Sequence, residues 1–111
     1  MELEFISEEK MRRGIEDCRE LVDARTAAEY DREWAGEIDA CDFCGEKIQP
    51  DMEFFADAEI HLDDGVWGIL CPYCISMGGN EMIWGRGQLY QYQADRDAWL
   101  MVAGFPPEHL R

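Results

Sequence analysis

The stretch that decides the fold begins with Cys41-Asp42-Phe43-Cys44 and ends with Cys71-Pro72-Tyr73-Cys74, with 26 residues between the two motifs. Two residues between paired cysteines let one tight turn direct both sulfurs at a single point. Two such turns supply four thiolates, which close a tetrahedral shell around zinc and leave no position for water or substrate. The spacing therefore predicts one structural Zn²⁺ bound by Cys41, Cys44, Cys71 and Cys74.

With Gly45 directly after the first pair and Pro72 inside the second, these motifs resemble the zinc-ribbon superfamily. The resemblance covers roughly the middle third of the chain. It implies that each pair sits on a knuckle at the base of a β-hairpin, where Gly45 suits a turn position that often needs a positive φ. It implies a metal and a fold but no particular function, because zinc ribbons serve many functions.

Two other interpretations of the cysteines stay open. One is a pair of disulfides in a secreted protein. The other is a thiol oxidoreductase that uses Cys71 and Cys74, since this motif resembles the active site of glutaredoxin-like enzymes. A redox pair of that kind opens a helix whose N-terminus lowers the thiol pKa. Gly78 and Gly79 follow closely and argue against a long helix here, so the sequence favours metal binding.

Composition indicates a single acidic domain. The chain has 111 residues, 47% of them hydrophobic, which is enough for one domain with its own core. Its net charge is -15, and residues 41–85 contribute nine acids against one base, Lys47. This excess repels nucleic-acid phosphates and anionic membranes and attracts basic proteins. We therefore expect no double-stranded DNA and no membrane among its ligands, and a basic protein as its partner.

Features of the sequence also bear on the compartment. The first residues are acidic and no apolar stretch follows them, so we expect no secretion signal. No run approaches 18 apolar residues. Cys18 is a fifth cysteine without a counterpart, and an unpaired thiol is typical of a reducing compartment. The sequence predicts a cytoplasmic protein.

An amphipathic helix is predicted near the N-terminus. Ser7 has the features of an N-cap, and the apolar positions Met11, Ile15, Cys18 and Val22 recur at helical spacing. Cys18 lies on this stripe, so we expect a buried side chain and not a ligand. Two roles are open for the stripe: the core of the monomer, or the seam of a dimer.

The remaining elements complete an α+β prediction. Thr26 begins a capping-box pattern, so we expect a second helix, or a continuation of the first after a bend, to about Gly36. Asp63-Asp64-Gly65 is typical of a hairpin turn. Strands are expected at 52–56, 59–62, 66–70, 89–93 and 98–103. The prediction is a single domain, in which an N-terminal helical segment (1–37) packs on a small antiparallel zinc-ribbon-like sheet (38–104), followed by a tail (105–111).

Candidates for catalysis are few, so we expect a non-enzymatic module that docks to another protein. His61 beside Asp63 and Asp64 offers too few ligands for a defined second metal site. One specific form of such a module is an inhibitor or decoy of a nucleic-acid-binding protein. The alternative is a nucleic-acid- or transcription-associated ribbon that binds through residues 84–92, where aromatic side chains and arginine are interleaved.

Two sets of residues are candidates for partner binding. The acidic set would steer a basic partner toward the protein. The second set combines the residue types that dominate interfaces, although large aromatic residues also serve simply as core in a domain of this size. The acidic candidates are Asp57, Glu59, Asp63 and Asp64. The interface candidates are Trp84, Arg86, Tyr90 and Tyr92.

Overall fold

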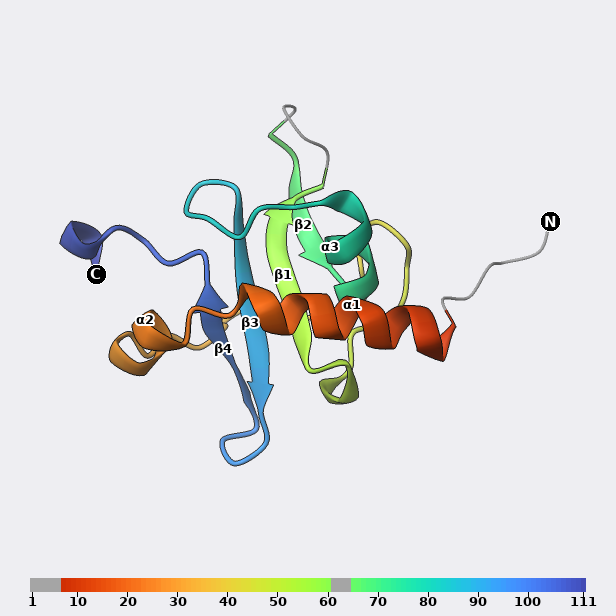
Figure 1. The fold of residues 1–111 in the computed structure, drawn as a ribbon, viewed down its shortest axis with the longest axis horizontal. Helices are drawn as coiled ribbons and strands as arrows, with labels where there is room; N and C mark the ends of the chain where they lie inside the picture. The colour runs from red at the N-terminus through yellow and green to blue at the C-terminus, as the bar shows by residue number, and fades with distance from the viewer. Residues whose placement is uncertain (1–6, 61–64) are drawn as a thin grey trace.

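A four-stranded antiparallel sheet with helices against it makes up the fold (Figure 1). The computed structural model describes residues 7–60 and 65–111. The strand order is β2-β1-β3-β4, and α1 crosses one face of the sheet with α3 beside it. This arrangement confirms the predicted α+β class. The strands are β1 (Phe54–Glu59), β2 (Trp67–Leu70), β3 (Gly87–Gln93) and β4 (Ala98–Ala103), and the helices are α1 (Glu8–Leu21), α2 (Ala24–Glu29) and α3 (Pro72–Gly78).

Helix α1 begins where the sequence predicts. The hydroxyl of Ser7 accepts a hydrogen bond from the backbone N–H of Lys10 (3.2 Å), which satisfies one of the free donors of the first turn. Cys18 is fully buried, and the other members of the stripe pack against the same core. The apolar stripe is therefore used inside the monomer.

The two faces of the sheet bury different kinds of side chain. The face toward the helices carries mostly small and aliphatic residues besides Phe54; among them is Ala56, which is paired in register with Leu70 and Leu89. The opposite face is aromatic: the rings of Phe55 and Tyr90 stack with their centroids 5.1 Å apart. Edge-to-face contacts from Trp34 and Trp99 extend this aromatic cluster.

The second helix is much shorter than the sequence predicts. Helix α2 ends at Glu29, and the chain after it is extended along β4, where the N–H of Trp34 donates to the carbonyl of Trp99 (2.9 Å). The prediction of a helix to about Gly36 is wrong. Pairing with β4 covers an open strand edge and brings Trp34 onto the aromatic cluster, and these gains outweigh local helix preference.

The strand bounds before residue 65 also differ from the prediction. Strand β1 begins at Phe54, two residues later than the expected strand at 52–56, because Pro50–Met52 form a 3₁₀ turn and Glu53 turns the chain with a φ of 71°. The expected strand at 59–62 overlaps β1 only at Glu59, and its residues 61–62 lie outside the described part. Residues 1–6 and 61–64 lie outside the described part, and with them most of the predicted Asp63-Asp64-Gly65 turn and His61.

The later elements agree closely with the prediction. Strands β3 and β4 pair as an antiparallel hairpin through the expected turn at 94–97. In the predicted tail, Glu108–Leu110 form one 3₁₀ turn, and the guanidinium of Arg111 donates to the carbonyl of Pro106 (3.0 Å). Within residues 7–60 and 65–111, no helix combines the length and hydrophobicity that crossing a bilayer requires.

Candidate metal centre

The first cysteine pair lies at the tip of a short hairpin formed by residues 39–48. The N–H of Cys41 donates to the carbonyl of Glu46 (2.8 Å), which closes the turn. The N–H groups of Cys44 and Glu46 then lie 3.5 Å from the sulfurs of Cys41 and Cys44 respectively. Donors directed at sulfur favour its thiolate form. Gly45 has a φ of 83°, the left-handed conformation that the zinc-ribbon resemblance implies for this position.

The second pair sits in a helix and not in a second knuckle. Cys71 is the N-cap of α3, Pro72 occupies the first turn, and Cys74 lies one turn into the helix. Proline is favoured at the start of a helix because its fixed φ suits the first turn and its missing N–H would have had no partner there. Gly79, with a φ of 62°, ends α3 after seven residues. The two glycines thus keep this helix short without preventing it.

The two motifs converge on one point. The four Sγ atoms of Cys41, Cys44, Cys71 and Cys74 all lie within 4.8 Å of one another. The sulfurs of Cys44 and Cys71 are 3.7 Å apart. A tetrahedral zinc–thiolate site with bonds of about 2.3 Å places its sulfurs about 3.8 Å apart, whereas a disulfide requires about 2.0 Å. These four cysteines form no disulfide and their sulfurs lie at metal-binding distances, so the four could hold a metal ion.

Burial and hydrogen bonding make this sulfur cluster suited to a cation. Cys41, Cys71 and Cys74 are buried, and Cys44 faces solvent. Hydrogen bonds from the Cys71 and Cys74 thiols hold the pKa of Cys41 well below its usual range. The same bonding to Cys41 raises the pKa of Cys71 to about 12 and raises that of Cys74. Four sulfurs this close are all thiolates only with a cation among them.

Three contacts position the two motifs, and sequence reasoning missed the residues that make them. Asp42 ties the knuckle to β2: its N–H donates to the carbonyl of Ile69 and its carboxylate accepts from the N–H of Ile69, both at 2.7 Å. Gly14 lets α1 approach the start of α3, because a Cβ there would lie 2.7 Å from the backbone of Pro72. On the same side of α3, Ser76 donates a hydrogen bond to Asp17. The Cys-Asp motif and the helical glycine were the available signals.

Cys18 is separate from this cluster. It lies on the inner side of α1 and is fully buried. Burial raises the pKa of its thiol to about 12, with smaller contributions from the charges of Asp17 and Glu53. It does not belong to the group of four cysteines that lie within metal-binding distance. Its position agrees with the prediction that it acts as a small buried hydrophobic residue.

The interface candidates do not share one surface. Tyr90 is only 4% exposed and stacks on Phe55, so it serves the core. Tyr92 is half-buried against Trp99, and its hydroxyl donates to Asp97 (2.5 Å). Trp84 is exposed, in the loop that precedes β3. Arg86 is also in that loop and exposed.

The acidic candidates are divided in a similar way. Asp57 and Glu59 are half-buried and alternate along β1 with buried residues. Burial raises the pKa of the Asp57 carboxyl group. Asp63 and Asp64 lie outside the described residues. Their role in steering a partner stays a prediction.

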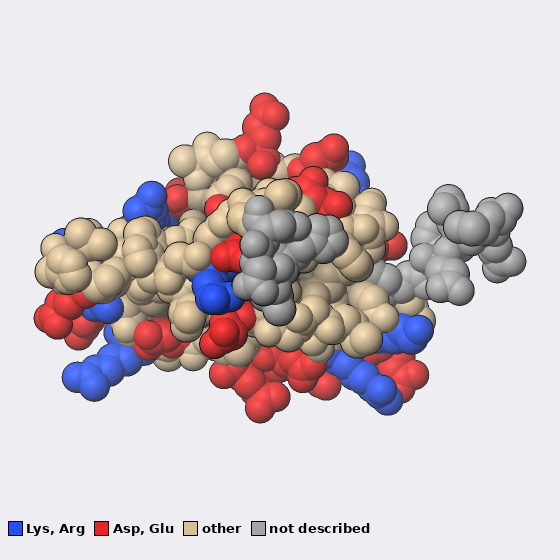
Figure 2. All heavy atoms as spheres, turned by 90° about the horizontal axis from the view of Figure 1, so that it is seen from above, with Lys and Arg blue, Asp and Glu red and all other residues tan. Residues whose placement is uncertain are grey.

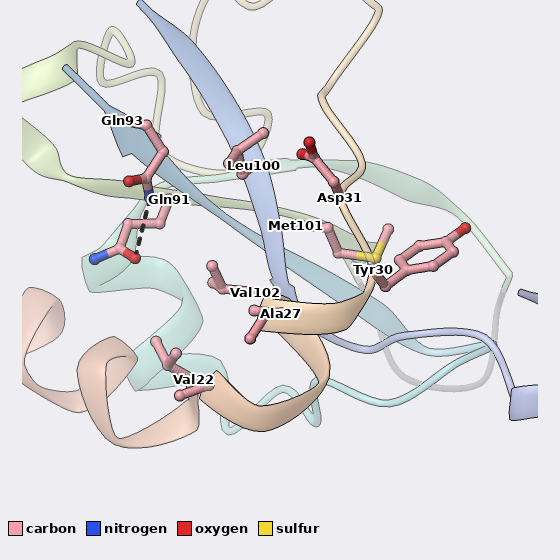
Figure 3. A pocket seen from close by; sticks show the side chains of 11 residues that line it. Val22, Ala27, Tyr30, Asp31, Gln91, Gln93, Leu100, Met101 and Val102 are labelled. Atoms are coloured by element: carbon pink, nitrogen blue, oxygen red, sulfur yellow. Dashed lines mark hydrogen bonds between the residues drawn. The ribbon is translucent and has the colours of Figure 1, made fainter. Parts of the chain in front are cut away.

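A hollow of about 300 Å³ lies at the other end of the sheet, between α2 and strands β3 and β4 (Figure 3). Its walls are largely aliphatic, with Val22, Leu100 and Val102 among them. On the wall that β3 forms, Gln93 donates to the side-chain oxygen of Gln91 (3.4 Å). No sequence signal pointed to it, and its lining contains no cysteine or histidine.

Comparisons of the chain with protein-family models, curated proteins and solved structures found no match.

Proposed function

We propose that the chain is a non-enzymatic binding module whose fold is held together by one structural Zn²⁺. The observation that carries the zinc assignment is the convergence of four cysteine sulfurs within 4.8 Å of one another. An all-thiolate set of four is typical of structural zinc, and it leaves no ligand position for a substrate. Cys41, Cys44, Cys71 and Cys74 would hold the ion, and the donors of the knuckle support it through N–H contacts to sulfur.

The metal would join two segments that lie far apart in the sequence. The knuckle and α3 are separated by β1 and β2 in sequence, and each supplies two of the sulfurs. Binding free energy at such a site contributes directly to folding, because the unfolded chain offers no preformed site. We therefore expect removal of the ion to loosen the knuckle and α3 together.

Elemental analysis of the protein, purified without added metal, tests this proposal. We expect one zinc per chain and four thiols protected from alkylation until the metal is chelated. Thermal unfolding, followed with and without a strong chelator, should show a lower melting temperature after chelation. Absence of zinc, or an unchanged melting curve in chelator with all thiols reactive, would falsify the proposal.

The docking role rests on charge. The chain carries a net charge of -15, and four thiolates with one Zn²⁺ would make it about two units more negative, since -4 + 2 = -2. In Figure 2 acidic side chains gather mainly along the lower margin of the face, with others at its upper margin. Such a surface steers basic proteins toward it. A basic protein whose nucleic-acid site is occupied in this way would be inhibited.

Capture experiments at two salt concentrations test the docking role. Zinc-loaded protein should retain basic proteins from a native extract at low salt, and retention should weaken as salt rises. A bait with Asp57 and Glu59 changed to lysine is the control and should bind them more slowly. Equal capture of acidic and basic proteins by both baits would contradict the proposal.

A thiol oxidoreductase is the second candidate, and one observation favours it. Cys71 caps the N-terminus of α3, which is the position that activates a redox cysteine. The two knuckle sulfurs beside this pair favour metal binding instead. A thiol–disulfide exchange assay separates the candidates: a structural metal site predicts no exchange by the zinc-loaded protein, whereas an oxidoreductase needs Cys71 and Cys74 free.

A nucleic-acid-associated module is a weaker alternative. Of its predicted binding residues, Tyr90 is buried in the core, while Trp84 and Arg86 remain on the surface. Binding of single-stranded nucleic acid through these two residues should fall steeply with salt. Fluorescence anisotropy with single-stranded oligonucleotides at two salt concentrations would measure it.

A further inference from the structure

An apolar groove borders the cysteine cluster. It encloses about 280 Å³, and Cys74 is one of the residues that line it. Leu70 is buried, and two apolar side chains are unusually exposed, Phe43 at 62% and Met77 at 68%. Exposed apolar surface of this kind, gathered around a hollow, marks a binding site more often than scattered single residues do.

The walls of the groove come from the two elements that carry the cysteine pairs. Phe43 lies inside the first motif, between Cys41 and Cys44. Tyr73 and Met77 come from α3, with Tyr73 inside the second motif. Ile60, at the end of β1, completes the lining on the sheet side. Any ion that clamps the knuckle to α3 therefore also sets the width of this groove.

The surroundings of the groove are acidic. The Asp42 carboxylate and the Ile60 side chain both lie against Gly68, so an acid stands beside the lining, and the exposed Glu81 directly follows the lining residue Asn80. A zinc–tetrathiolate centre beside Cys74 would add a net charge of -2. The two nearby basic residues, Lys10 and Arg13, belong to α1. They line a separate crevice between α1 and α3, on the other side of Tyr73 and Met77 from the groove. The sheet side of the groove thus favours positive charge.

We infer that this groove is the docking site for a basic protein segment that inserts one large apolar side chain, with lysine or arginine on either side of it. The inference rests on the proposed function and deepens it by naming the surface and the chemistry of the partner. The apolar side chain would fill the space between Phe43, Ile60 and Met77. Flanking cations would lie toward Asp42 and Glu81, and an arginine could also stack on an aromatic ring. Docking would require the metal, since the metal positions two of the walls.

Selection from a library of random short peptides displayed on phage, with zinc-loaded protein as bait, tests this inference. We expect the enriched peptides to share one large apolar residue flanked by basic residues. Synthetic versions are then titrated by fluorescence anisotropy against the wild-type protein and Met77→Glu. Replacing the exposed Met77 adds a negative charge and removes an apolar wall, so binding should weaken about tenfold or more, as for a central anchor contact.

Leu110→Glu is the matched control, because Leu110 is 56% exposed, lies near the C-terminus and takes the same change of charge. It should bind the peptides as the wild type does. Chelated protein should lose the binding. Within the peptide, changing the apolar residue to alanine should weaken binding as much as Met77→Glu does.

Several results would overturn the inference. These are no enrichment, enrichment of acidic or purely polar peptides, and equal binding by Met77→Glu and the wild type. If sedimentation shows a dimer that Met77→Glu dissociates, the occupant is a second copy of this chain, and the basic-segment assignment is wrong. Zinc content keeps the two proposals distinguishable. If the purified protein contains no zinc, the proposed function is wrong. If the zinc-loaded protein binds basic peptides equally well with and without Met77→Glu, the proposed function stands and only the groove assignment is wrong.

Discussion

The five cysteines differ in their surroundings, and these decide their chemistry. Cys41 accepts hydrogen bonds from neighbouring thiols, which lowers its pKa, and it lies beside three further sulfurs. The side chain of Cys18 is fully buried in the interior of the protein, and burial raises the pKa of its thiol to about 12. A thiol with so high a pKa stays protonated near neutral pH and is a poor ligand and a poor nucleophile.

Cys18→Ala should therefore retain full zinc content and lose about 1 kcal/mol of unfolding free energy, because only packing is removed. Cys74→Ser, at one of the four clustered sulfurs, is the contrasting variant and should lose zinc. Elemental analysis and denaturant unfolding measure the two effects. A fall in the zinc content of Cys18→Ala would show that the ligand set is different.

Glu53 provides a second prediction, which concerns how the stability of the protein depends on pH. Both carboxylate oxygens accept hydrogen bonds from the Arg19 guanidinium, at 2.6 and 3.0 Å, and this pairing lowers the pKa of Glu53 below its ordinary value of 4.5. A lowered pKa contributes stability above the ordinary value, and this is lost as pH falls through the folded-state pKa. Glu53→Gln should thus destabilise the protein most near neutral pH.

The difference in unfolding free energy between wild type and Glu53→Gln, followed as pH falls below about 4.5, measures this effect. Both proteins have the same backbone turn and the same cysteines, so effects of acid on the metal centre largely cancel in the difference. The difference should shrink as the pH falls. A difference that is constant with pH would show that the ion pair with Arg19 contributes nothing.

At the scale of elements, the contact of α1 with α3 determines where the second cysteine pair lies. The two helices meet at Gly14, where the backbone of Pro72 and Tyr73 fills the space that a side chain would need. The hydrogen bond from Ser76 to Asp17 lies on the same side of α3. Helix α1 thus positions the turn that carries Cys71 and Cys74.

Gly14→Ala should destabilise the protein and weaken its hold on zinc, although the same change in an exposed helix stabilises by about 1 kcal/mol. The added Cβ lies 2.7 Å from backbone atoms, so one helix must shift. Arg12→Ala, at an exposed position of α1, is the control and should leave both properties unchanged. Melting temperature and zinc transfer to a competing chelator are the measurements; a higher melting temperature for Gly14→Ala would contradict the close contact.

At the scale of the whole molecule, the net charge bears on which partners the protein attracts and which it repels. The net charge of -15 is spread over residues 1–85, while residues 86–111 balance three acids against three bases. Repulsion from phosphates acts over about 8–10 Å at physiological salt, so it reaches across much of a small surface. We therefore expect specific contacts to form with basic or neutral partners.

We accordingly predict no measurable affinity for double-stranded DNA near physiological salt. Nearly all non-specific binding to DNA comes from cations that neutralise phosphates, and this chain has an excess of anions. Anisotropy titration with a random duplex measures it. Binding tighter than about 1 μM, which is stronger than the usual non-specific range, would contradict the prediction.

What the sequence determined by itself rests on local physics. The N-cap of α1 at Ser7 was predictable because it depends on a few neighbouring residues. Strands β3 and β4 were predictable because alternation and a short turn define a hairpin. The four clustered cysteines were predictable because two-residue spacing already directs each pair at one point. Together these gave the α+β class and the four cysteines that could hold a metal ion.

The tertiary structure alone decided the features that depend on distant neighbours. The chain after Glu29 is extended because the edge of β4 is there to pair with it. Tyr90 belongs to the core because Phe55 and Trp34 cover it. Cys71 opens a helix because α1 can receive that helix at Gly14. The groove beside Cys74 exists only where the knuckle, α3 and the end of β1 come together. Local preferences amount to a few tenths of a kcal/mol per residue, and burial and pairing between distant segments outweigh them.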